Sequence, residues 1–105
     1  MTRDSRHELA EARSLALHET VARRIADDPT VLARARERVL GWIAAGQPHA
    51  EFAEAWLALL DGPSESLLSV LTGRSEQAIE LRQVSPFAGV VPPRERWALW
   101  RATRP

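Results

Sequence analysis

Three side chains near the start of the chain are of types that bind metal ions. His7, Glu11 and His18 are separated by four and seven residues, so a helix would carry them along one stripe. At helical rise the two histidines are about 16 Å apart, so one ion cannot be bound by both. The sequence HELAE also lacks the second histidine of the HExxH signature. We therefore expect a solvated flank beside the core face and no metal site.

Signatures of catalysis are missing from the sequence. There is no GxSxG elbow for a nucleophilic serine, and no GxxxxGK[ST] or GxGxxG loop for phosphates. The absence of cysteine excludes a thiol nucleophile, a thiolate zinc site and a disulfide. The carboxylate pairs Glu51 with Glu54 and Glu76 with Glu80 fall on predicted outer helix faces, where acids are normally solvated. We expect neither enzyme activity nor a cofactor.

The C-terminal segment carries the most informative pattern. At the helical period, one face gathers two tryptophans and three arginines: Trp97, Trp100, Arg94, Arg101 and Arg104. These two residue types are enriched at binding hot spots, because tryptophan supplies apolar area and arginine supplies planar donors. The tryptophans could instead pack into the helical body beneath the arginines. Both placements remain open, and one tryptophan could take each.

Charge is segregated along the chain although the net charge is zero. All fourteen cations are arginine, and there is no lysine. Residues 41–80 contain Arg74 against six acids, whereas residues 81–105 contain five arginines against Glu95. This segregation favours oriented contact with a charged partner.

The elements that must position these side chains are helices. Apolar periodicity and capping residues predict helices over 5–27, 29–45, 49–61, 64–72 and 76–84, and a last one from near 93 to about 103. Asp28 and Ser75 are expected to cap the second and fifth helices. We expect one all-α domain over 1–105, a compact bundle of five to six short helices. Its parts are a helical body (5–84), a proline-rich loop (85–93) and a C-terminal helix (94–103).

The arginines of the second helix suggest a helix-turn-helix only superficially. The following helix, HAEFAEAWLALL, is acidic and has no arginine, asparagine or glutamine to read bases. We expect Arg34 and Arg38 to form a polar face, paired locally with Glu37 or Asp27.

The proline-rich loop is too apolar for an ordinary solvated connection. Three prolines and a glycine exclude a helix, yet Phe87, Val90 and Val91 lie among them. A loop stiffened by proline loses little entropy on binding, so Phe87 could be presented to a partner. Phe87 could equally plug the base of the helical body.

The end of the chain resembles a family of small helical bacterial proteins encoded beside nucleotidyltransferase-type toxins. The resemblance rests on the stretch RQVSPFAGV at 82–90, followed by ERW at 95–97 and by Trp100 and Arg101, with weaker likeness over LALHETVARRI and WLALLDGP. These relatives are similar to the antitoxins of toxin–antitoxin pairs in which the toxin adds nucleotides to tRNA. The resemblance thus implies a protein that binds its cognate toxin and masks the nucleotide or tRNA site.

Twelve residues are the candidates for partner binding. The motif supplies ten of them and the helical face supplies Arg94 and Arg104: Arg82, Gln83, Ser85, Pro86, Phe87, Gly89, Arg94, Arg96, Trp97, Trp100, Arg101 and Arg104. The alternative function is a nucleic-acid-binding module or operon autorepressor that uses the same arginines and tryptophans. The charged N-terminus and the lack of an 18-residue apolar run predict a cytoplasmic protein without membrane contact.

Overall fold

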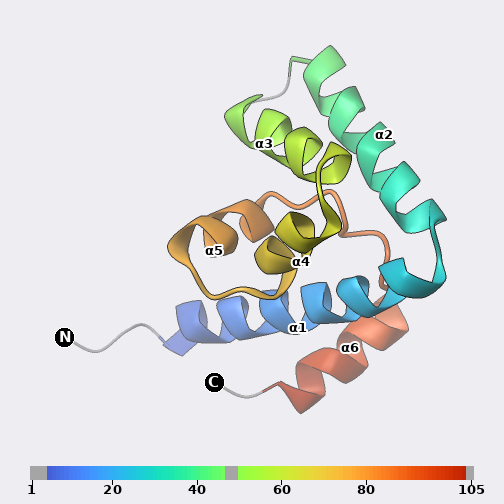
Figure 1. Cartoon of the computed structure of the whole chain (residues 1–105). Helices are drawn as coiled ribbons and strands as arrows, with labels where there is room; N and C mark the ends of the chain where they lie inside the picture. Colours follow the sequence, from blue (N-terminus) through green and yellow to red (C-terminus); the bar gives the residue numbers. More distant parts are fainter. Residues whose placement is uncertain (1–4, 47–49, 104–105) are drawn as a thin grey trace.

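The computed structural model describes residues 5–46 and 50–103, and these form six α-helices without a strand. The helices are α1 (Ser5–Asp27), α2 (Thr30–Ala44), α3 (Ala50–Asp61), α4 (Ser64–Thr72), α5 (Glu76–Gln83) and α6 (Pro93–Ala102) (Figure 1). The predicted all-α bundle is confirmed, and each helix begins and ends within one residue of its predicted bounds. None of the described helices is long and apolar enough to cross a membrane.

The long helix α1 is the base on which the other helices assemble. Helices α4 and α5 pack on one side of α1, and α6 lies against its other side (Figure 1). Helices α2 and α3 lie side by side and join this base through α4 and the end of α1. The loop at 84–92 runs from α5 back to the far end of α1, which brings α6 beside it.

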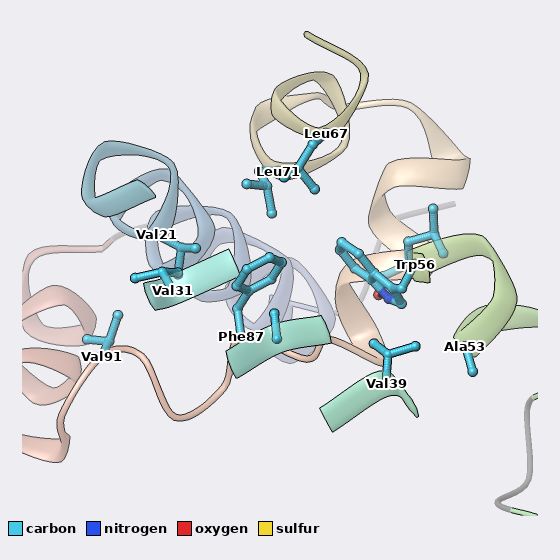
Figure 2. Close-up of a cluster of buried hydrophobic side chains, with 11 residues drawn as sticks. Val21, Val31, Val39, Ala53, Trp56, Leu67, Leu71, Phe87 and Val91 are labelled. Carbon is cyan, nitrogen blue, oxygen red and sulfur yellow. The ribbon is translucent and has the colours of Figure 1, made fainter. Parts of the chain in front are cut away.

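The core gathers at the centre of the bundle around two aromatic rings. Trp56 of α3 and Phe87 of the loop are fully buried and meet edge to face, with ring centroids 5.7 Å apart. Figure 2 shows them among valines of α1 and α2 and leucines of α4. The indole N–H of Trp56 donates to the carbonyl of Leu81 at 3.1 Å, so the one polar group of this ring is satisfied. Phe87 therefore plugs the helical body, the second of its two predicted placements.

Short polar side chains start two of the helices. Ser75 caps α5 as predicted, because its Oγ accepts the backbone N–H of Ala78 at 3.1 Å. The carboxylate of Asp28 accepts both the N–H and the hydroxyl of Thr30, where α2 begins. The N-cap residue of α2 is Pro29, and no side chain caps this helix, so the predictions that Asp28 caps it and that Pro29 lies within its first turn are wrong.

The arginines of α2 are paired differently from the prediction. Arg36 forms a bidentate ion pair with Asp61 at the end of α3, with N–O distances of 2.8 and 3.2 Å. Within residues 5–46 and 50–103, no ion pair joins Arg34 or Arg38 to Glu37 or Asp27, so that prediction is wrong. The reason is tertiary: both side chains lie beside the loop at 84–92, where they border a cavity.

Candidate partner-binding surface

The most exposed large apolar side chain belongs to Trp97 in the middle of α6. Its side chain is 60% exposed, whereas the core tryptophan, Trp56, is fully buried. Its ring meets that of Trp100 edge to face, with centroids 5.7 Å apart and planes at 71°. Trp100 is half-buried, so one tryptophan faces outward and the other anchors the first. The sequence left open whether the tryptophans face a partner or the helical body, and the structure has one in each position.

Two arginines from different parts of the chain cover the ring of Trp100. The guanidinium carbons of Arg13 on α1 and Arg96 on α6 lie 5.2 and 5.9 Å from the ring centroid. Such cation–π contacts favour positive charge at the ring face. Arg13 was not among the predicted site residues, because it lies on α1, 87 positions earlier, and only the fold brings it to α6.

We call these residues, together with the two exposed arginines of α6, the Trp–Arg surface: Arg13, Arg94, Arg96, Trp97, Trp100 and Arg101. In the described chain, neither Arg94 nor Arg101 has a hydrogen bond or ion pair. The one carboxylate of α6, Glu95, binds Arg24 of α1 and does not offset them. The surface is therefore cationic around an exposed apolar ring.

Helix α6 is fixed to the body at three points. Leu99 packs against the core cluster, and Glu95 pairs with Arg24. The guanidinium of Arg96 donates to the carbonyl of Ala88 at 2.7 Å, and that of Arg24 donates to the carbonyl of Val90 at 3.1 Å. The Trp–Arg surface is thus held on a rigid support, and a partner would not have to order it.

Beneath the surface, the loop is attached to α1 by a serine and a buried histidine. His18 Nδ1 lies 2.7 Å from the carbonyl of Ser14 and its Nε2 lies 2.7 Å from Ser85 Oγ. A carbonyl can only accept, so Nδ1 carries the proton and Nε2 accepts the hydroxyl proton of Ser85. Burial lowers the pKa of His18 to about 4, which keeps the ring neutral. Ser85 Oγ in turn accepts the backbone N–H of Phe87 at 3.1 Å.

This histidine–serine pair has the spacing of a base and a nucleophile. In a catalytic triad a carboxylate accepts the hydrogen bond from Nδ1–H of the histidine. Here the acceptor of that hydrogen bond is the backbone carbonyl of Ser14. The pair therefore fastens the loop to α1. A cavity of about 250 Å³ lies beside it, with Arg96 and Trp100 on its wall. The Trp–Arg surface thus has a recess at its edge.

Three of the twelve predicted partner-binding residues are buried: Arg82, Pro86 and Phe87. Phe87 lies in the core, whereas Arg82 borders the recess beside Trp100 and Pro86 borders a second cavity. Arg82 donates from one nitrogen to the carbonyls of Val70 and Gly73, each at 2.7 Å, and so joins α5 to the end of α4. Burial lowers the pKa of Arg82. These bonds give Arg82 a structural role that the sequence did not predict, in addition to its place on the wall of the recess beside Trp100.

The other predicted residues divide between the loop and α6. Gln83 and Gly89 are exposed, and Ser85 is half-buried against His18. Arg94, Arg96, Trp97, Trp100 and Arg101 come together on α6. Arg104 lies outside the described residues.

The stripe of His7, Glu11 and His18 does not form one unit. His7 and Glu11 make a surface pair at 3.0 Å, whereas His18 is 2% exposed. The predicted solvated flank is therefore wrong for His18, because the loop at 84–92 covers it. The described residues contain no cluster of three or more His, Cys, Asp or Glu side chains that could hold a metal ion.

Fold and surface define this chain as a small helical domain with a rigid cationic, aromatic face. Comparisons with protein-family models, with curated proteins and with solved structures found no match.

Proposed function

We propose that this protein is an antitoxin that binds a nucleotidyltransferase-type toxin through the Trp–Arg surface and masks the toxin's nucleotide or tRNA site. The observation that carries the proposal is Trp97, a large apolar ring 60% exposed on a helix fixed to the body at three points. The toxin as partner comes from the resemblance of residues 82–101.

The energetic argument starts from the exposed ring. Burying a tryptophan against a partner removes a large apolar area from water, and tryptophan and arginine dominate measured hot spots. Because Trp97 already rests against Trp100 and α6 is held by the core, few side chains lose freedom on docking. The recess beside Trp100 offers a place for an apolar side chain of the partner.

Charge supports a partner whose contacting surface is acidic. The arginines flanking Trp97 have no acid of α6 among their partners, since Glu95 binds Arg24. Guanidinium groups bind carboxylates through two parallel hydrogen bonds, which fixes orientation as well as charge. A site that binds phosphates is itself cationic, so the complementary acidic patch on the toxin would border that site, and the bound protein would block access to it.

Co-expression with the product of the adjacent gene, followed by size-exclusion chromatography, tests the proposal. We expect the two proteins to co-elute at micromolar concentration, and Trp97→Ala to weaken binding by about 2 kcal/mol, roughly thirtyfold. Ile43→Ala is the matched control, because Ile43 is 43% exposed but lies on α2. Separate elution of the two wild-type proteins would overturn the proposal, and equal loss in both variants would move the interface away from α6.

Nucleic-acid binding through the same surface is the alternative outcome of this test. The rings of Trp97 and Trp100 stand at 71°, so they do not form a parallel platform for successive bases. One arginine from α1 and one from α6 already lie over the ring of Trp100. A shift of RNA or operator DNA whose affinity falls steeply with salt would favour this alternative.

A further inference from the structure

A second feature of the molecule lies away from the Trp–Arg surface, at the corner where the end of α1 and the start of α2 meet the loop before α6 (Figure 1). A cavity of about 260 Å³ opens there. Three arginines border it, Arg24 from α1 and Arg34 and Arg38 from α2, so we call it the arginine cavity. Arginine heads from two helices converge on one recess.

The two arginines of α2 reach the cavity because of their spacing. Arg34 and Arg38 are four residues apart and share a stripe of α2 with Val31 and Ala35, which supply part of the apolar wall. The loop supplies the facing wall with Pro86 and Val90, two residues of the SPFAGV motif. The cavity is therefore cationic at its rim and apolar behind it.

The positive charge of the rim is not cancelled within the described chain. Arg24 is engaged by Glu95 and by the carbonyl of Val90. Arg34 and Arg38 have neither a hydrogen bond nor an ion pair there. Asp28 is the one carboxylate on the wall, and one of its oxygens accepts both polar hydrogens of Thr30. Arg34 attracts the carboxylate of Asp28, but the three guanidinium groups of the rim outnumber the two carboxylates beside them, Asp28 and Glu95.

Gly89 explains how Arg38 can lie so close to the loop. A Cβ at residue 89 would lie 3.3 Å from a terminal nitrogen of Arg38, so a side chain there would move this exposed guanidinium by a few tenths of an ångström. The φ angle of Gly89 is not in the left-handed region, and close approach is the feature that favours glycine here. The glycine of the motif thus leaves room for an arginine head at the cavity rim.

We infer that the arginine cavity binds the phosphate group of a small phosphomonoester. Guanidinium forks match the oxygens of a phosphate, and a doubly charged monoester gains more from two unpaired arginines than a single carboxylate does. The volume, near the lower end for ligand sites, fits a phosphate with a short apolar extension. The apolar wall of α2 and the loop would receive that extension. This inference is independent of the proposed toxin binding.

Titrations of the full chain with inorganic phosphate and with phenyl phosphate, at constant ionic strength in chloride, test the inference. Backbone amide NMR shifts should change at Gly89, Val90 and the residues around Arg34 and Arg38. We expect phenyl phosphate to bind more tightly than phosphate, because its ring reaches the apolar wall. The double variant Arg34→Gln/Arg38→Gln should weaken binding at least about tenfold. Both side chains are exposed, so the fold should survive this change.

Arg74→Gln is the matched control, since it removes one exposed positive charge from the connection between α4 and α5. It should leave both affinities unchanged. No shift change up to tens of millimolar ligand, or an equal effect in the double variant, would overturn the inference. An oligonucleotide without a terminal phosphate should not compete with phenyl phosphate. If the oligonucleotide competes with phenyl phosphate and this competition requires Arg34 and Arg38, the cavity binds a nucleic-acid backbone. That result would overturn the inference that its ligand is a small phosphomonoester.

Discussion

The imidazole of His18 and the hydroxyl of Ser85 lie 2.7 Å apart although 67 residues separate them in the chain. The bond closes a large loop of the structure, because it fixes the segment before α6 to the middle of α1. His18 must be neutral for its Nε2 to accept the hydroxyl proton of Ser85, and the oxygen of Ser85 also accepts the backbone N–H of Phe87. The hydrogen bond in which His18 accepts from Ser85 therefore requires a neutral imidazole.

This dependence predicts a loss of stability in mild acid. The pKa of His18 is about 4 in the folded protein, because burial disfavours the charged ring, and 6.5 is its ordinary value. The unfolded chain therefore takes up the proton first. The contribution of the neutral ring is complete above pH 6.5 and is lost as the pH falls toward 4. We expect urea unfolding to show about 2–3 kcal/mol less stability at pH 4.5 than at pH 7.5 from this group.

The pKa of His18 can be measured directly by NMR titration of the histidine ring resonances. His7, which is exposed and lies on the same helix, is the position for the control variant. His18→Gln should remove most of the difference in stability between the two pH values, whereas His7→Gln should retain it. A His18 resonance that titrates near 6.5 would contradict the prediction.

Ser85→Ala should destabilise the protein without unfolding it at neutral pH. The substitution leaves His18 Nε2 without its donor and the N–H of Phe87 without its acceptor. Leaving buried polar groups unsatisfied costs about 1–3 kcal/mol. Ser66→Ala is the control, because Ser66 is exposed on α4 and should change the free energy of unfolding by less than about 0.5 kcal/mol. Equal midpoints in urea for the two variants would show that the bond contributes nothing.

The fold was predictable because local chemistry marks its boundaries. Asp28 and Pro29 separate the first two helices, Gly62 and Pro63 precede α4, and Ser75 starts α5. Each of these signals acts over a few residues, so it can be found in the sequence. Whether Phe87 faces the core or a partner depends instead on the shape of the whole bundle, and the residues around it favour both placements equally.

The functional surfaces were less predictable because they are assembled from distant segments. The face of α6 follows from helical periodicity, but the contact of Arg13 with Trp100 requires the packing of α1 against α6. The same holds for Arg34 and Arg38, since their place at the cavity depends on the path of the loop. The sequence around a helical arginine is the same whether its side chain is solvated, forms an ion pair or borders a cavity together with other arginines.

Arg82→Ala should be destabilising because Arg82 is an interior link between α5 and α4. Its guanidinium nitrogen satisfies the carbonyls of Val70 and Gly73, and the residue is 6% exposed. Loss of these charge-assisted bonds and of the packed stem should cost about 2–3 kcal/mol in urea unfolding. Arg74→Ala, in the exposed connection between α4 and α5, should cost almost nothing. Toxin affinity at a temperature where the Arg82 variant is folded should be unchanged; a loss of affinity there would place Arg82 in the interface.

The last prediction contrasts two tryptophans in opposite environments. Trp56→Ala removes a fully buried ring, its edge-to-face contact with Phe87 and its hydrogen bond to Leu81, so it should cost about 3–5 kcal/mol. Trp97→Ala removes an exposed ring that touches Trp100, so it should cost about 1 kcal/mol or less. Thermal and urea unfolding of both variants measure the difference. If Trp97→Ala destabilised the protein as much as Trp56→Ala, its ring would be part of the core, and the Trp–Arg surface would lose its binding role.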